Sequence, residues 1–436
     1  MSQTAGSADI DGRGNREGAR LFRHWFDGLG AAAEENRGGA YVFVMGSLGE
    51  LLSTFDLPLV FPEINSLQTA VRHVAHEYLD EAEDVGYSPD ICGYVKADVA
   101  TQMRGGRLPM GRIPKPAIAV LTNACNTYIK WAEIWERMYH MPAYVLDVPG
   151  SRQDGQPATR GTSGFERDRR YVAAQLRELI GVLETVTKKK FDVDRLRVAM
   201  KHVNTMSRGW KRVLELNAST PSLFNALSDG TIYLGVCNGF RGHELGARYF
   251  DELVEEMEYK RDHGIGTLVD EKFRLAFVGV PCYPIFRRFT ELFSEHGGTF
   301  VNSTYLWFAS GGSNLGFEYD MDADPIESLA EGVLLGVSDA MDSMFFQTHA
   351  LSRMIDEFAV DGVVYHPIKS CRTTSTGLAD ARRALMEMRD IPSLFIESDM
   401  MDRRVVSEAQ LKNRIDAFFE GLHSRRQQAA AGNAQA

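Results

Sequence analysis

The chain has 436 residues, a formal net charge of -11 and ordinary proportions of hydrophobic (44%) and charged (25%) residues. This length predicts two or three domains, and the acidic balance excludes broad binding to nucleic acid or to an anionic membrane through a basic surface. No apolar run approaches the roughly 18 residues of a transmembrane helix, the polar start has no signal-peptide pattern, and an odd number of cysteines, five, favours reduced thiols. We therefore expect a soluble, cytoplasmic protein.

Short apolar runs alternate with longer helical patterns along the chain, as in an α/β fold with parallel sheets. After residues 1–18, which we expect to be loose, the first half has four predicted strands, Ala40–Val44, Leu57–Val60, Ala117–Leu121 and Ala143–Leu146. The Gly-, Ser- and Pro-rich segment Pro149–Gly164 marks the exit from this half.

Two helices are predicted next, over Glu166–Lys188 and Asp192–Leu216. The second half again has four predicted strands, Leu275–Val280, Thr299–Asn302, Gly362–Tyr365 and Ser393–Ile396. A last helix is predicted over Ser407–Leu422, and the end from Arg425 has no core-forming side chains. Four strands in each half suggest two similar modules.

From these patterns we predict five regions. They are an N-terminal extension and helix (1–39), a first α/β module (40–164), a helical connecting region (165–265), a second α/β module (266–424) and a disordered tail (425–436). The expected fold is α/β, with two Rossmann- or flavodoxin-like modules that each hold a four-stranded parallel sheet, plus additional helices.

Three cysteines stand at predicted helix starts. Cys92 follows Ser88–Ile91, which is typical of an N-cap and a first helical turn; Cys125 opens the predicted helix Asn126–Tyr139; and Cys371 follows an apolar run and precedes a helix. The orphan N–H groups of a helix N-terminus favour a thiolate and lower the thiol pKa. Metals bind the thiolate, so these positions suit a metal cluster.

Spacing alone leaves the metal site open. The chain has no Cys-x-x-Cys, and separations of 33 residues (92 to 125) and 246 residues (125 to 371) match no compact zinc or ferredoxin signature. A lone cysteine is more often a small buried apolar side chain, and Cys237 and Cys282 also sit at predicted strand ends. Ligands from both modules would place a metal in the cleft between them.

Other polar residues also follow predicted strands. The turn Gly46–Glu50 is either an ordinary βα connection or a loop whose N–H groups meet an anion or a carbonyl oxygen. Glu63 either caps a helix or, in a dry cleft, transfers protons. His73 and His76 share a predicted helix face and could bind metal, although a surface or core role is the simpler interpretation. The sequence has no P-loop, G-x-G-x-x-G or G-x-S-x-G motif.

Five segments resemble those of the 2-hydroxyacyl-CoA dehydratase and benzoyl-CoA reductase superfamily: GSLGELLSTFDLPLVFPEINS, GYSPDICGYVK, LTNACNTYIKWAEIWE, HPIKSCRTTSTG and IPSLFIESDMMDRR. They span nearly the whole chain. Within the superfamily the resemblance is greatest to the larger of the two cluster-bearing subunits of ATP-dependent benzoyl-CoA reductases.

The resemblance implies a [4Fe–4S] cluster held by three cysteines, whose matching positions are Cys92, Cys125 and Cys371. One iron is then left without a protein thiolate, and the remaining two cysteines become structural. In related dehydratases a Ser and a Glu lie near that open position, and Ser47 and Glu63 match them by place. These two residues are the catalytic candidates.

The implied activity is that of an ATP-hydrolysing oxidoreductase acting on CH–CH groups. Low-potential electrons pass one at a time to the ring of benzoyl-CoA, giving a cyclohexadiene-carbonyl-CoA. The implied partners are a homologous cluster-bearing subunit and a two-subunit ATPase with its own cluster, supplied by ferredoxin; no nucleic acid or membrane is expected. The alternatives are a 2-hydroxyacyl-CoA dehydratase subunit, a non-catalytic electron-relay or scaffold subunit and, less favoured, a structural zinc protein.

Overall fold

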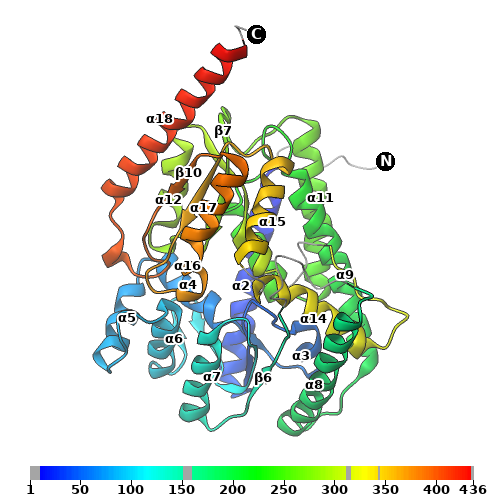
Figure 1. Cartoon of the computed structure of the whole chain (residues 1–436). Coiled ribbons are helices and arrows are strands. Elements are labelled where there is room, and N and C mark those ends of the chain that lie inside the picture. Colours follow the sequence, from blue (N-terminus) through cyan, green and yellow to red (C-terminus); the bar gives the residue numbers. More distant parts are fainter. Residues whose placement is uncertain (1–9, 151–159, 311–315, 342–343, 434–436) are drawn as a thin grey trace, which may run out of the picture.

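Two four-stranded parallel sheets form the framework of the protein, one above the other in Figure 1. The computed structural model describes residues 10–150, 160–310, 316–341 and 344–433. The first sheet holds β1 (Gly39–Tyr41), β2 (Leu59–Val60), β5 (Pro116–Thr122) and β6 (Ala143–Leu146). The second holds β7 (Phe273–Gly279), β8 (Gly298–Ser303), β9 (Gly362–His366) and β10 (Ser393–Phe395). All eight predicted strands are confirmed, with β1 shorter than expected.

The two sheets share one topology. The strand order is β2-β1-β5-β6 in the first sheet and β10-β9-β7-β8 in the second. The first sheet, numbered along the chain, has the order 2-1-3-4, and the second has the order 4-3-1-2, which places its first and third strands side by side as well. Ligands of such doubly wound sheets bind outside the carboxyl ends of the strands, at the switch point between these two strands. The prediction of two similar α/β modules is therefore correct.

The first sheet is surrounded by short helices. They are α3 (Gly49–Leu52), η1 (Ser53–Phe55), α4 (Pro62–Val71), α5 (Ala75–Asp84), α6 (Gly93–Met103) and α7 (Asn126–Tyr139). A small hairpin of β3 (Arg107–Leu108) and β4 (Gly111–Arg112), which the apolar pattern did not predict, connects α6 to β5. Two-residue strands are too short to produce a recognisable alternation of apolar and polar side chains.

Four consecutive helices connect the two sheets: α8 (Ser163–Thr187), α9 (Val193–Leu216), α10 (Ser228–Gly239) and α11 (Glu244–Asp262). Asp192 caps α9 by accepting hydrogen bonds from the N–H groups of Asp194 and Arg195. Both helices predicted in this region are confirmed within a few residues. The exit segment Pro149–Gly164 lies largely outside the described residues, because 151–159 are not described.

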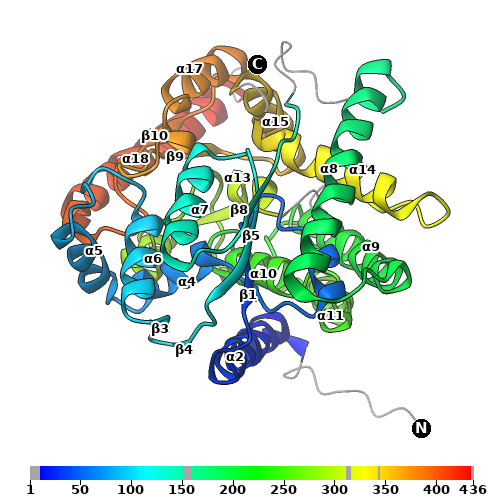
Figure 2. The same cartoon turned by 90° about the horizontal axis from the view of Figure 1, so that it is seen from below.

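Cys237 does not follow a strand as expected. It lies inside α10, whose first turns contain the apolar run Thr231–Val236. A short apolar run rich in β-branched residues fits a buried strand or a buried helix equally well. Here it packs against the N-terminal helix α2 (Arg13–Glu34), which also contacts α11 (Figure 2).

The second sheet carries the remaining helices. They are η2 (Tyr283–Ile285), α12 (Phe286–Ser294), α13 (Thr304–Phe308), α14 (Pro325–Met341), α15 (Met344–Glu357), α16 (Arg372–Ser375), α17 (Leu378–Arg389), η4 (Arg403–Val405) and α18 (Glu408–Asn433). None of the helices in the described part of the chain is both long and apolar enough to cross a membrane.

Both ends are more ordered than the sequence indicated. At the start, α2 begins at Arg13, and the N–H groups of Gly12 and Gly14 donate to the buried carboxylate of Glu256 at 2.7 and 2.6 Å. This carboxylate anchors part of the segment 1–18 that was expected to be loose; residues 1–9 lie outside the description.

At the C-terminal end, the disordered tail predicted for 425–436 is wrong as far as Asn433, where α18 ends. Figure 1 shows its last turns projecting beyond the rest of the molecule. The C-terminal segment is rich in Ala, Gln and Arg, which are strong helix formers. It therefore continues α18 although it has no core-forming side chains. Arg425 pairs with Asp390 and Arg426 pairs with Asp361, and these ion pairs connect the middle of α18 to the second module.

A buried carboxylate ties α6 to α7. Asp98 is 1% exposed and accepts hydrogen bonds from the indole N–H groups of Trp131 and Trp135, both at 2.7 Å, and from Gln102 at 2.9 Å. Burial raises the pKa of Asp98 to about 6, and the three donors limit the rise. Since α6 and α7 begin directly after Cys92 and Cys125, Asp98 also sets the relative position of these cysteines.

Asp98→Ala should lower the free energy of unfolding by about 2 to 4 kcal/mol, because it leaves two buried indole N–H groups without an acceptor. Urea unfolding followed by tryptophan fluorescence measures this change. Glu136→Ala, on the exposed face of α7, is the matched control and should change stability by less than about 0.5 kcal/mol. Equal effects of the two substitutions would contradict the role assigned to Asp98.

Candidate active site

Three of the five cysteines converge where the carboxyl ends of the two sheets meet. Cys125 follows β5 and Cys371 follows β9, so each comes after the third strand of its sheet, at the switch point. Cys125 Sγ lies 3.4 Å from Thr373 Oγ1. The ionised forms of Cys371 and Cys125 both act electrostatically on Cys92. The structure therefore brings together the three predicted ligand residues, from both modules.

Each of the three cysteines is the N-cap of a helix, and Cys125 and Cys371 have an extended backbone. For Cys92 the local reason differs from the prediction. Ser88 does not cap the helix; its hydroxyl accepts a hydrogen bond from the N–H of Asp90 in a turn, and α6 begins only at Gly93. The extra turn places Cys92 at the helix start, and the N–H of Gly93 donates to Ser370 Oγ in the second module at 3.4 Å.

The pKa values of two of these thiols, Cys92 and Cys371, move opposite to expectation. Burial raises the pKa of Cys92 well above its ordinary value, and the neighbouring Cys371 and Cys125 raise it further. The backbone N–H groups of Val95 and Tyr94 lower the pKa, but they offset only part of this rise. Burial likewise raises the pKa of Cys371, despite the hydroxyl of Thr374. Desolvation therefore outweighs the helix N-terminus, and three neighbouring thiolates need a positive centre beside them.

The donor set of the described residues does not form a site for a single metal ion. Among the described residues, no three His, Cys, Asp or Glu side chains lie close enough to hold one metal ion together. A structural zinc site requires four such ligands in a tight tetrahedron. The three thiols belong to the N-caps of three separate helices, α6, α7 and α16. Three cysteine thiols, the donor type that iron–sulfur clusters take, are thus present in this part of the structure.

The other cysteines and the two histidines stand apart from this arrangement. Cys237 is buried in α10 and its thiol faces Ser310 O at 3.9 Å. Cys282 follows β7, and burial raises the pKa of its thiol to about 11. His73 and His76 do not share a helix face, because His73 has a left-handed backbone (φ 62°) between α4 and α5. Both histidine side chains are exposed.

Glu63 lies in the first turn of α4, buried beside the cysteines. Its Oε2 accepts a hydrogen bond from the N–H of Val44 at 2.9 Å, and its Oε1 accepts one from Tyr128 Oη at 2.8 Å. Burial raises the pKa of Glu63 to about 7, and the two hydrogen bonds hold back the rise. A carboxyl group with this pKa can both accept and release a proton near neutral pH.

Tyr128 links Glu63 to the thiols, and the sequence pattern did not single it out. It lies in the first turn of α7, three positions after Cys125, and its ring stacks on Phe43 with 3.8 Å between centroids. The charges of Glu63 and Cys125 both act on its hydroxyl. The sequence signal for Tyr128 was its position three residues after Cys125. Buried core residues of any helix have the same spacing, so this signal does not indicate a functional residue.

The loop that carries Ser47 is pressed against the end of β5. Gly46 has φ 85°, and a Cβ there would lie 2.6 Å from Thr122 Cγ2, so only glycine fits. The hydroxyl of Thr122 donates to Met45 O at 2.9 Å. Ser47 itself is 4% exposed. The loop therefore lies beside the Thr122–Cys125 connection, as its place after β1 predicts.

Glu50, at the end of this loop, is held in a buried ion pair. Its Oε2 pairs with Arg241 Nε at 2.9 Å, and its Oε1 accepts a hydrogen bond from the hydroxyl of Tyr319. The pair is almost fully buried and connects the first module to the helical region. Its role is therefore to hold the loop in place.

A group of buried tyrosine hydroxyls interacts electrostatically with Glu63. Tyr94, in the first turn of α6, has a buried hydroxyl that interacts with the hydroxyls of Tyr283 and Tyr305 and lowers their pKa values. Tyr283, Tyr305, Glu63 and Cys92 all act electrostatically on it. Tyr283 Oη donates to Tyr305 Oη at 3.1 Å. The site thus combines three thiols, one carboxyl group of near-neutral pKa and several hydroxyls that are shielded from water.

Comparison with known proteins identifies relatives over most of the chain. The family model described as 2-hydroxyglutaryl-CoA dehydratase, D-component, matches residues 49–422. The chain is 31% identical to the B-type subunit of benzoyl-CoA reductase from Thauera aromatica over 419 residues, 94% of each chain. It is 27% identical to the (R)-2-hydroxyisocaproyl-CoA dehydratase alpha subunit of Clostridioides difficile, over 86% of this chain and 88% of the relative.

A further relative is the (R)-phenyllactyl-CoA dehydratase alpha subunit of Clostridium sporogenes, 27% identical over 87% of this chain and 88% of the relative. All three relatives are named as subunits. Of the five candidate residues, only Ser47 lies outside the stretch that the family model matches.

Glu63 should make stability depend on pH. The pKa of Glu63 is about 7 in the folded chain, and its ordinary value is 4.5. Between pH 4.5 and 7 the folded state therefore binds a proton that the unfolded state has released. The contribution of Glu63 to the free energy of unfolding is complete below pH 4.5 and is lost as the pH rises through 7. Relative to Glu63→Gln, the wild type should therefore lose about 3 kcal/mol of unfolding free energy from pH 4.5 to 8.

Urea unfolding of both proteins across this pH range tests the prediction, with Glu136→Gln on the exposed face of α7 as a control that should follow the wild type. Parallel stability curves for the wild type and Glu63→Gln would show that the Glu63 carboxyl is not perturbed.

Proposed function

Because this chain belongs to the 2-hydroxyglutaryl-CoA dehydratase D-component family, we propose that it is the iron–sulfur subunit of an ATP-dependent benzoyl-CoA reductase. The observation that carries the proposal is the convergence of Cys92, Cys125 and Cys371 from both modules beside the buried carboxyl of Glu63. The similarity to a benzoyl-CoA reductase subunit over almost the whole chain supports the choice of this activity within the family.

Three thiolates, from Cys92, Cys125 and Cys371, would hold a [4Fe–4S] cluster. When bound, such a cluster supplies low-potential electrons one at a time to a ring that its thioester carbonyl has activated. The chain offers three cysteines here, which would leave one iron without a protein thiolate, as catalytic metal sites keep a position free of protein ligands. The helix N-termini at all three cysteines stabilise the negative charge of the thiolates.

The side chains around this position handle protons and exclude water. Ring reduction to a cyclohexadiene takes up two electrons and two protons. Glu63 can hold one proton on its carboxyl oxygens at neutral pH and release it, because its pKa is about 7. Tyr128 donates to Glu63 Oε1 and so orients the carboxyl group. The buried hydroxyl of Ser47 is the second polar group that we assign to the catalytic position.

The electrons require a donor outside this chain. We assign that role to a two-subunit ATPase with its own cluster, which ferredoxin supplies, and we expect this chain to pair with a homologous cluster-bearing subunit. The relatives are named as subunits, which supports an assembly. The sequence contains no P-loop, in keeping with ATP hydrolysis elsewhere in the complex.

Dehydration of a 2-hydroxyacyl-CoA is the second candidate function, because several relatives are dehydratase alpha subunits. In that reaction the electron is recycled, so ATP serves only for activation. A pure scaffold or electron-relay role is less favoured. A scaffold has no use for a buried carboxyl of near-neutral pKa next to three converging thiols.

Cys371→Ser should remove the cluster. Iron and sulfide per chain should fall several-fold in the anaerobically purified complex, because only two thiolates would remain. Cys282→Ser is the matched control, because Cys282 also follows a strand of the second module but interacts with other residues than the three cysteines. This variant should keep the iron content of the wild type. Unchanged iron in Cys371→Ser would remove the basis for the ligand assignment.

The reaction itself is tested with benzoyl-CoA and the purified complex under anaerobic conditions. A reductase should consume two electrons from reduced ferredoxin, with ATP hydrolysed in proportion, for each ring reduced. The measurement is the ratio of reductant, ATP and diene product. A catalytic rather than stoichiometric need for ATP and reductant, with turnover of a 2-hydroxyacyl-CoA, would assign the chain to the dehydratases instead.

A further inference from the structure

Four hydroxyl side chains follow Cys371 closely in the chain: Thr373, Thr374, Ser375 and Thr376. The hydroxyls of Ser375 and Thr376 donate to backbone carbonyl oxygens at 3.1 and 2.7 Å, a common arrangement for Ser and Thr in or after a helical turn. The hydroxyls of Thr373 and Thr374 have different partners. Each of them lies against the sulfur of a cysteine.

The two threonines contact cysteines of different modules. Thr374 Oγ1 donates to Cys371 Sγ at 3.2 Å, within the turn that begins α16. Thr373 Oγ1 lies 3.4 Å from the sulfur of Cys125, which belongs to the first module. A thiolate accepts hydrogen bonds and cannot donate them, so Thr373 is the donor in this contact when Cys125 is ionised. One short helix therefore brings a hydroxyl to one sulfur of each module.

No cation takes over this role at Cys371 in the described part of the chain. Among the main groups that shift the pKa of Cys371, only Thr374 lowers it, whereas burial and two neighbouring negative charges raise it. The nearby cationic side chains are engaged elsewhere. Lys369 pairs with Glu397, and Arg372 donates to a backbone oxygen. A negative charge on this sulfur is therefore stabilised by a hydroxyl group.

Hydrogen bonds to its sulfurs help to set the reduction potential of an iron–sulfur cluster. Reduction adds an electron and makes the sulfurs more negative, so a donor stabilises the reduced state more than the oxidised state. The potential is then less negative than it would be without the donor. This effect is larger where water is excluded. Thr374 is half-buried and Thr373 is exposed, so Thr374 should have the larger effect.

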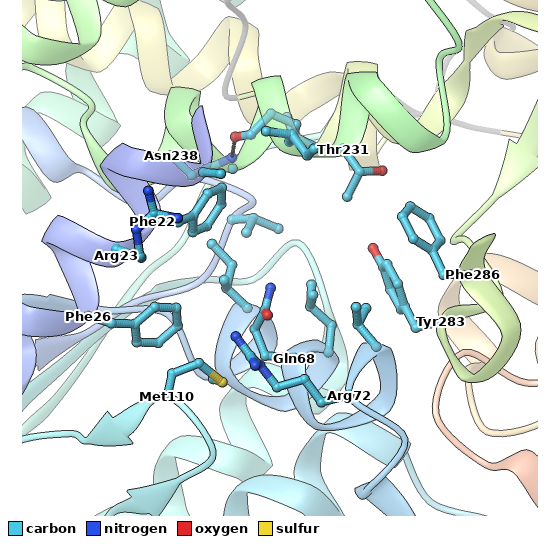
Figure 3. Close-up of a pocket in the computed structure, with 18 of the residues that line it drawn as sticks. Phe22, Arg23, Phe26, Gln68, Arg72, Met110, Thr231, Asn238, Tyr283 and Phe286 are labelled. Carbon is cyan, nitrogen blue, oxygen red and sulfur yellow. Dashed lines mark hydrogen bonds between the residues drawn. The ribbon is translucent and has the colours of Figure 1, made fainter. Parts of the chain in front are cut away.

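These threonines stand apart from the cavity beside the tyrosine hydroxyls. The cavity has a volume of about 470 Å³ and lies between α2, α4 and α10, with Tyr283 and Phe286 in its wall (Figure 3). The described residues that line it include none from α16. A substitution at Thr373 or Thr374 therefore changes the surroundings of the sulfurs without changing the shape of this cavity.

We propose that Thr373 and Thr374 tune the reduction potential of the cluster by donating hydrogen bonds to the thiolates of Cys125 and Cys371. They are positioning residues, because they act on the cluster through a sulfur. The external donor supplies the electron, and the hydroxyl protons stay on their oxygens, so reduction transfers one electron and no proton. The inference rests on the proposed function only in requiring the cluster, and it holds for a reductase and a dehydratase alike.

A redox titration of the anaerobically purified complex, followed by electron paramagnetic resonance, measures this potential. The signal of this chain's cluster is the one that Cys371→Ser lacks. Thr374→Val removes the hydroxyl but keeps a similar shape, so it should shift the potential to a more negative value. Thr373→Val should shift it in the same direction by a smaller amount. Thr374→Ser keeps a hydroxyl and should restore the potential of the wild type.

Thr376→Val is the matched control. It removes a hydroxyl of the same segment that donates to a backbone oxygen, so it should leave the potential unchanged. Iron and sulfide per chain should equal the wild-type values in all of these variants, because no ligand is removed. A merely structural role of the threonines would lower the iron content without the ordered shift in potential.

An unchanged potential in Thr373→Val and Thr374→Val, with full iron content, would overturn the tuning role and leave the proposed function standing. Equal shifts in Thr374→Val and Thr376→Val would also contradict it, as would loss of iron from both threonine-to-valine variants of the sulfur contacts. A wild-type complex in which this chain holds no cluster would overturn the proposed function and this inference together.

Discussion

The meeting of two parallel sheets at their carboxyl ends is the constraint on which the rest of the site depends. In both sheets the first and third strands are neighbours, and the switch point lies between them. The contact between Cys125 Sγ and Thr373 Oγ1 joins these two points. If one module were displaced, the cysteine that follows β9 would separate from the two that belong to the first module. Every chemical property of the site therefore depends on this interface between modules.

Burial determines the chemistry at this interface. Removal from water raises the pKa of Cys92, Cys371 and Glu63, although helix N-termini and hydrogen bonds act in the other direction. The same effect has two consequences. Thiols that ionise with difficulty need a cationic partner, and a carboxyl group with a pKa of about 7 becomes useful for proton transfer. Asp98 and the Glu50–Arg241 pair are buried too, but their hydrogen bonds serve to hold helices and loops in position.

The sequence predicted the regular framework well. All eight principal strands were recognisable, because buried parallel strands are continuous apolar runs, and Cys125 and Cys371 were placed at helix starts by local pattern. The errors lie where local signals were weak. The apolar run before Cys237 is a helix, the short hairpin was not visible, and both ends of the chain are helical further than expected. In each case tertiary packing or helix propensity decided between conformations that the residue pattern left equal.

The sequence by itself determined the α/β class, the pair of modules and the residue types available for chemistry, since these follow from periodicity and composition. Only the tertiary structure decided which of them act together. Tyr128 reaches Glu63, Tyr283 and Glu63 act electrostatically on Tyr94, and α2, α4 and α10 line one cavity, although these partners are far apart along the chain. The physical reason is that contact and desolvation depend on three-dimensional neighbours. The spacing of residues along the chain contains neither.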